Sequence, residues 1–289
     1  MVTYNPKDWL TLIFQFHKSD TFRILFPAMI LVGCYTGLVV FLEADYMKLQ
    51  FKNPTIVHSI LGFVLSMLLV FRINSAYDRW WEGRKLWGSF VNNSRNLSFK
   101  LCAFIPKENR ELRARFRVLI TNYIYVTKEH LRDKFIASEL EECDALPLAE
   151  LEKTKHRPNR IAYQLMVETE KLREQKIISD EKFLLMNEEL RSFTEITGAC
   201  ERIRNTPIPY AYSLFLKKII FIYVFTMPVA FAQDFRYWAI PVTIFIFYAF
   251  ASLELISEEI EDPFGKDDND LPTDELAGKI KENLREIFE

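Results

Sequence analysis

Long uncharged runs lie near the two ends of the chain, and the middle is dense in charged residues. Four segments built on these runs are long enough, or nearly so, to cross a bilayer: about Phe22–Leu42, Ile56–Phe71, about Tyr210–Gln233 and about Phe235–Leu255. The first is uncharged from Ile24 onward, Lys217 and Lys218 interrupt the third near its start, and the fourth is uncharged from Tyr237 to Leu253. A membrane helix needs roughly 17–25 residues, so the second run, with sixteen, is short. Pro27, Pro228 and Pro241 lie inside these runs, where neighbouring helices can satisfy the freed backbone groups. The pattern predicts four membrane helices.

The charged middle shows apolar residues at spacings of three and four, which is typical of amphipathic helices. The predicted helices are Trp80–Ile105, Arg110–Phe135, Ile161–Gln175 and Asp180–Arg204, and a last one covers Thr273–Phe288. Asp180 is the expected N-cap of its helix. No segment alternates as a half-buried strand would. The expected fold is therefore all-α, a four-span membrane protein with a cytosolic helical portion.

The distribution of charge sets the expected orientation. Positive residues gather after the second run and before the third, whereas the short links after runs one and three carry few. The positive-inside rule then places both termini and residues 72–209 in the cytoplasm. The uncharged stretch Trp9–Phe16 is too short for a signal peptide and fits an interfacial segment over residues 1–20. A net charge of −2 gives no support for a nucleic-acid partner.

The sequence contains no recognisable catalytic apparatus. Phosphate-cradling glycine loops, GxSxG and HExxH motifs are missing, and the chain has only eight glycines. Four cysteines are scattered without a CxxC pair, so we expect free thiols. No two of the four histidines have the spacing of paired ligands on one helix. We expect neither an enzyme nor a required cofactor.

Within the second run, Phe63, Met67 and Phe71 recur at intervals of four and so share one stripe of a helix. Such a stripe either packs against neighbouring helices or lines a hydrophobic constriction that controls ions by dewetting. Arg72 follows the stripe directly. It either attracts anions, anchors the helix at the membrane interface or pairs with Asp78.

Three blocks carry a family resemblance over nearly the whole chain. They are Gly62–Ser66 running through Phe71-Arg72 to Asn74–Arg84, then Glu201–Tyr212, then Glu261–Asp270. Their residues, order and spacing resemble the bestrophin ion-channel family, in particular its prokaryotic branch. The resemblance implies a homopentamer around a central pore, in the inner membrane of a bacterium, with the lipid bilayer and monovalent ions as its other partners.

The resemblance also assigns roles to residues. Phe63, Met67 and Phe71 would line the pore neck as three apolar rings, and Ile178 would form a second, cytosolic constriction, unless it is a core residue. The acidic segment resembles a calcium clasp, in which Asp267 and Asp270 supply side-chain oxygens and Asp262 a backbone carbonyl. Acidic runs are also often solvated surface, so calcium binding stays open.

The implied function is passive permeation of small monovalent ions. These would be cations such as sodium if the chain follows some prokaryotic members, or chloride if it follows the eukaryotic ones. The alternative is a non-conducting membrane scaffold or sensor with the same fold. The expected organisation is an interfacial segment (1–20), membrane helices one and two with the neck (21–72), a cytosolic helical region (73–209), membrane helices three and four (210–256), and an acidic segment with a terminal helix (257–289).

Overall fold

The computed structural model describes residues 20–47 and 54–289, and all regular elements in that part of the chain are helices. The predicted interfacial segment therefore lies outside the described residues, apart from Asp20. The chain divides into two compact units. The apolar unit comprises the described residues up to Arg79 together with Pro207–Glu261, and the charged unit comprises Trp80–Thr206 together with Asp262–Glu289.

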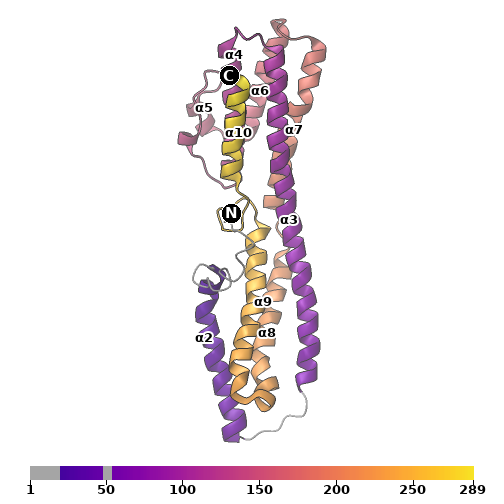
Figure 1. The fold of residues 1–289 in the computed structure, drawn as a ribbon, viewed down its shortest axis with the longest axis vertical. Coiled ribbons are helices and arrows are strands. Elements are labelled where there is room, and N and C mark those ends of the chain that lie inside the picture. Colours follow the sequence, from indigo (N-terminus) through magenta and orange to yellow (C-terminus); the bar gives the residue numbers. More distant parts are fainter. Residues whose placement is uncertain (1–19, 48–53) are drawn as a thin grey trace. The chain divides into compact units, whose positions relative to one another are not determined.

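The apolar unit is a bundle of helices. It contains α2 (Asp20–Val40), the first part of α3 (Pro54–Phe104), α8 (Tyr210–Phe235) and α9 (Ala239–Glu261). Helix α2 packs against α8 and α9, which also pack against each other (Figure 1). Leu65 and Leu69 of α3 are buried against apolar side chains of α8, including Met227. Short turns end two of the helices: the π-helical turn η2 (Phe41–Met47) follows α2, and the 3₁₀ turn η4 (Arg236–Trp238) links α8 to α9.

Three helical stretches in the described part of the chain are long and apolar enough to cross a membrane: Thr21–Glu43, Thr55–Phe104 and Tyr210–Glu261. The third, at 52 residues, is longer than one crossing requires and contains both α8 and α9. Large apolar side chains remain exposed along all of these stretches. A surface of this kind suits contact with lipid rather than water.

Helix α3 corrects one expectation from the sequence. The second apolar run and the helix predicted over Trp80–Ile105 are a single helix of 51 residues, Pro54–Phe104. The expected break rested on the change from apolar to charged composition after Phe71. That change alters what surrounds the helix but not its backbone, and neither glycine nor proline occurs between Arg72 and Arg79 to interrupt it.

The charged unit contains the second part of α3 and five further α-helices. They are α4 (Arg110–His130), α5 (Leu148–Lys153), α6 (Arg157–Glu174), α7 (Asp180–Asn205) and α10 (Thr273–Phe288), with the 3₁₀ turn η3 (Ala137–Glu139) after α4. Helix α4 packs against α6 and α10, and α6 packs against α7. The core includes Phe90, Tyr123 and Phe193, and the Tyr123 hydroxyl donates to the Phe193 carbonyl at 2.8 Å.

Several helix ends differ from the expectation; α6, for example, begins at Arg157 rather than Ile161. Helix α4 ends at His130 rather than Phe135, and Asp133 has a φ of 53°, a left-handed conformation that ends a helix. The N-cap of α7 is Ser179, not Asp180, because the Ser179 side chain accepts a hydrogen bond from the Lys182 N–H. Serine and aspartate are both good N-caps, and only the backbone decides which of two neighbours takes the position.

Candidate functional site

The proposed neck stripe lies on the surface of the chain. Phe63, Met67 and Phe71 of α3 are 66%, 46% and 59% exposed. Leu65 and Leu69, on another face of the same helix, are fully buried against α8. Within the described part of the chain, the stripe therefore contributes little to packing. It is free to face lipid, another copy of the chain or a pore.

Arg72, which follows the stripe, is buried in a cluster of ion pairs inside the apolar unit. Its guanidinium lies 2.7 Å from a carboxylate oxygen of Glu261 and 3.6 Å from one of Glu254, and it is 0% exposed. It pairs with these residues rather than with Asp78, so the expected partner was wrong. A buried cation held by two carboxylates exposes no net positive charge, and Arg72 is poorly placed to attract anions.

The rest of this cluster links α3, α8 and α9. Glu261 also accepts a hydrogen bond from the Ile208 N–H at 2.5 Å, and its backbone carbonyl accepts one from Arg79. Lys217 of α8 pairs with Glu258 of α9 at 2.5 Å. From its place at the end of the fourth apolar segment, Glu254 could be taken simply to mark the cytoplasmic boundary of the span. The recurrence of acids at 254, 258 and 261, on one face of α9, was the signal that could have revealed the cluster.

The acidic segment brings two of its three predicted residues together. Asp270 is buried, and its Oδ2 accepts a hydrogen bond from the Asp267 N–H at 2.6 Å. Its Oδ1 is buried without a hydrogen-bond partner in the described part of the chain. Burial raises the pKa of Asp270 to about 6, with a further contribution from the negative charges of Asp267 and Asp262.

Gly265 makes this arrangement possible. A Cβ at that position would lie 2.6 Å from Asp270 Oδ2 and 4.0 Å from the Asp262 carbonyl oxygen. The segment is closed by a hydrogen bond from the Leu271 N–H to the Pro263 carbonyl, and the Trp80 indole donates to the Asn269 carbonyl at 2.9 Å. The segment thus brings the Asp270 carboxylate against the Asp267 backbone, and both this carboxylate and the Asp262 carbonyl lie beside Gly265.

Ile178, the predicted second constriction, lies between α6 and α7 and is only 3% exposed. It belongs to the hydrophobic core of the charged unit. Within one chain this burial favours the core role that the sequence left open, and its role as a constriction stays a prediction.

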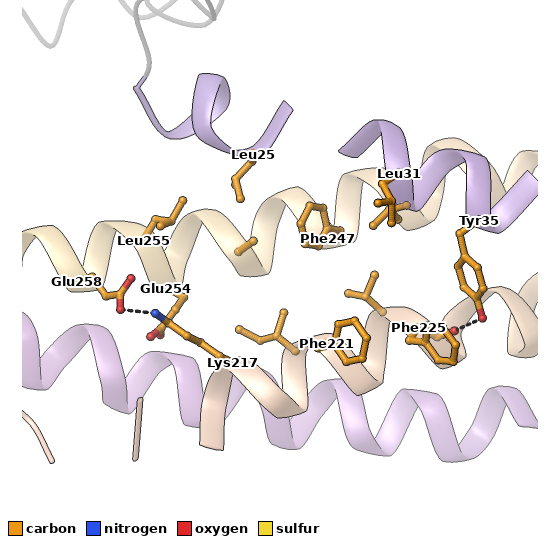
Figure 2. A pocket seen from close by; sticks show the side chains of 14 residues that line it. Leu25, Leu31, Tyr35, Lys217, Phe221, Phe225, Phe247, Glu254, Leu255 and Glu258 are labelled. Atoms are coloured by element: carbon orange, nitrogen blue, oxygen red, sulfur yellow. Dashed lines mark hydrogen bonds and ion pairs between the residues drawn. The ribbon is translucent and has the colours of Figure 1, made fainter. Parts of the chain in front are cut away.

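A cavity of about 440 Å³ lies among α2, α8 and α9 in the apolar unit (Figure 2). Its walls are mainly apolar, with Leu25, Phe221 and Phe247 among the lining residues. The Lys217–Glu258 pair and Glu254 lie at one end, and Tyr35, which donates to the Phe225 carbonyl, lies at the other. The fourteen lining residues include none of the neck stripe, so this cavity is distinct from the stripe.

Comparison with known proteins gives a consistent result over the whole chain. Residues 1–286 match the family model described as Bacterial/Fungal Bestrophin protein. A voltage-dependent anion channel-forming protein of Nostoc sp. is 32% identical over 290 residues, covering 99% of this chain and 94% of the relative. A protein of the same name from Escherichia coli K12 is 31% identical over 293 residues, with the same coverage.

Solved structures agree with the sequence relatives. A mutant of a bacterial bestrophin homolog from Klebsiella pneumoniae superposes with a TM-score of 0.82 at 29% identity, covering 90% of this chain and 97% of that one. Another mutant of the same homolog reaches a TM-score of 0.84 at 28% identity, covering 92% and 99%.

Proposed function

Because the chain belongs to the bacterial and fungal bestrophin family, we propose that it forms a homopentamer through which small monovalent ions pass passively. Membership of this channel-forming family identifies an integral membrane protein and a channel, not an enzyme. The observation that carries the proposal is the exposed stripe of Phe63, Met67 and Phe71, whose side chains stay about half exposed or more in the described part of the chain.

Five copies of α3 around an axis would turn the stripe into three apolar rings. Successive stripe residues are four positions apart, so the rings would be spaced by about 6 Å along the helix. Apolar side chains cannot coordinate an ion, and the rings would act as a barrier that opens when water enters. Met67 would make the middle ring adaptable because its unbranched thioether changes rotamer readily.

The names of the relatives support anions as the permeant ions, since the Nostoc and Escherichia coli proteins are both called anion channel-forming. The apolar rings themselves favour neither sign of charge, and Arg72 is neutralised by Glu254 and Glu261. Sodium-like cations are the alternative. An unpaired arginine facing the permeation path would favour anions directly, but Arg72 is buried and paired.

We place the channel in a bacterial inner membrane, with four crossings that correspond to α2, the first part of α3, α8 and α9. The distribution of lysine and arginine in the short connections supports cytoplasmic termini and a cytoplasmic charged unit. Helices α8 and α9, joined by the turn at Arg236–Trp238, are each long enough for one crossing.

Recordings from purified protein in planar bilayers under a sodium chloride gradient test the function. Wild type is expected to conduct, and its reversal potential near the chloride or the sodium equilibrium value identifies the permeant ion. The Phe63→Ala, Met67→Ala, Phe71→Ala variant is expected to conduct several-fold more because smaller side chains widen the rings.

The matched control is the Val57→Ala, Leu61→Ala variant, which shortens two exposed apolar residues on another face of α3. At about 100° per residue, that face is turned by roughly 100° from the stripe. Its conductance should equal that of wild type. Equal currents from both variants would remove the stripe from the pore, and silence of every form would support the non-conducting scaffold.

We also propose that the acidic segment holds a calcium ion. Hard cations prefer oxygen ligands, and Asp267, Asp270 and the Asp262 carbonyl offer them in one turn. The buried, unpartnered Oδ1 of Asp270 supports this assignment, because a buried carboxylate oxygen without a hydrogen bond is costly. A calcium ion there would supply positive charge to a turn whose carboxylates repel one another.

Calorimetric titration of the purified protein with calcium chloride tests this proposal. Wild type is expected to bind calcium, and Asp270→Asn should weaken binding at least about tenfold. Loss of a residue that merely supports a metal ligand already lowers metal affinity by about that factor, and Asp270 would itself be a ligand. Asp268→Asn removes a charge from an exposed neighbour outside the proposed ligand set and should bind as wild type does. Similar losses in both variants would show only a diffuse attraction of calcium to acidic surface.

A further inference from the structure

Three side chains with metal-binding atoms converge in the charged unit, and none belongs to the stripe or the acidic segment. His130 is the last residue of α4, His156 is the N-cap of α6, and Glu201 lies in α7. One oxygen of Glu201, Oε1, lies 2.7 Å from Nε2 of His130 and 2.9 Å from Nε2 of His156. The centres of the two imidazole rings are 4.7 Å apart. Three separate helix segments therefore aim their polar atoms at one point.

The surrounding structure holds these groups in place. The backbone carbonyl of His130 accepts a hydrogen bond from Arg204 at 3.1 Å, and the same guanidinium contacts Asp133. The Nδ1 atom of His156 accepts a hydrogen bond from the Asn159 N–H at 3.3 Å. The side chains of His130, His156 and Glu201 are 24%, 38% and 25% exposed, which lets a small ion reach them from solvent.

We propose that His130, His156 and Glu201 bind one divalent cation of the zinc type. Two imidazoles and one carboxylate are a set of ligands that zinc accepts, with a fourth position left for water. The ligand atoms all lie within 4.8 Å of one another. Bonds of about 2.0–2.2 Å in a tetrahedral site separate ligand atoms by roughly 3.3–3.6 Å, so small side-chain movements would admit the ion. Calcium and magnesium prefer oxygen ligands and are disfavoured here.

Metal binding has a structural consequence at the start of α6. In the metal-free chain Nδ1 of His156 accepts a hydrogen bond, so in the neutral ring Nε2 carries the proton and faces Glu201. A metal on Nε2 needs the lone pair of that nitrogen, so the single proton of the neutral ring moves from Nε2 to Nδ1, where it opposes the Asn159 N–H. The ion would then link α4, α6 and α7 while it releases the side-chain cap of α6.

Titration of the purified full chain with zinc alone, followed by calorimetry, tests the proposal. Wild type is expected to bind one zinc ion per chain at this site. His156→Asn removes the imidazole but supplies a side-chain oxygen that caps helices well, so α6 should stay folded. Glu201→Gln keeps the size of the side chain and its ability to accept hydrogen bonds. Each variant should weaken zinc binding at least about tenfold, because even the loss of a residue that only supports a metal ligand lowers metal affinity by about that factor. His17→Asn is the control, because it removes a histidine that is not one of the three proposed ligands, and it should bind as wild type does.

Two further readouts separate this site from other zinc binding. The four cysteines are free, so a competing result is zinc bound by thiolate. Cobalt substituted for zinc should show no thiolate-to-metal charge-transfer band, and hydrogen exchange at the Asn159 amide should become faster when zinc is added. Absence of binding, unchanged binding in both His156→Asn and Glu201→Gln, or a thiolate band would each overturn the proposal.

Discussion

Arg72 is a fully buried cation whose charge is balanced by Glu254 and Glu261. Burial of three charged groups costs desolvation energy, which their mutual attraction offsets only while all the partners are present. A single substitution in the cluster is therefore enough to destabilise the protein, since losing one member leaves the charges of the others uncompensated.

Replacement of Arg72 by methionine is expected to lower the free energy of unfolding by about 3–5 kcal/mol, because two buried carboxylates lose their cation. The measurement is the denaturation midpoint of the detergent-solubilised protein. Lys217→Met is the matched control, since it breaks the more exposed pair with Glu258 and should cost at most about 1 kcal/mol. Equal costs would contradict a special role for burial at Arg72.

Helix α3 presents different environments along a single helical backbone. Its first part exposes Phe63, Met67 and Phe71 and buries Leu65 and Leu69, whereas its second part enters the core of the charged unit through side chains such as Phe90. Periodicity predicted that Phe63, Met67 and Phe71 share one face, because helical spacing is a local property. It did not predict the continuity of the helix, since hydropathy reports the solvent around a segment rather than its backbone.

Helix α10 illustrates an element that could be predicted almost completely. The sequence placed it at Thr273–Phe288 with Leu276, Ile280, Leu284 and Ile287 on one face. The structure confirms these bounds and buries the first three residues, whereas Ile287 is only half-buried. A short amphipathic helix bounded by Pro272 depends mostly on its own residues. Its partner, α4, lies more than a hundred residues earlier and could not be inferred from the pattern.

At the scale of the whole molecule, charge pairs between distant segments make stability depend on pH. Asp274 of α10 lies 2.8 Å from Arg132, which follows the end of α4, and 2.8 Å from Lys128 of α4, and these cations hold its pKa below the usual range. Glu129 and Glu139 face the same lysine and share its charge. Protonation of Asp274 therefore weakens the attachment of α10 to α4.

The folded-state pKa of Asp274 is lower than its unfolded value of about 4, so its contribution is complete above that pH and is lost as the pH falls below it. The melting temperature should be nearly independent of this group between about pH 5 and 7 and should drop below about pH 4. Asp274→Asn should lower the melting temperature at neutral pH and reduce the drop. An unchanged acid profile in the variant would assign the dependence to other carboxylates.

The sequence by itself determined the helical segments, the apolar runs and the family, because the length of a run, its periodicity and the order of motifs can be read from residues close together in the chain. Only the tertiary structure decided which distant groups meet. His130 and Glu201 are 71 residues apart, and Arg72 finds its partners on a helix near the other end of the chain. The exposure of Asp267 and the burial of Asp270, three residues later, were equally undecided. Such contacts depend on how helices pack against one another, and that packing results from many weak interactions summed over the whole fold rather than from any local pattern.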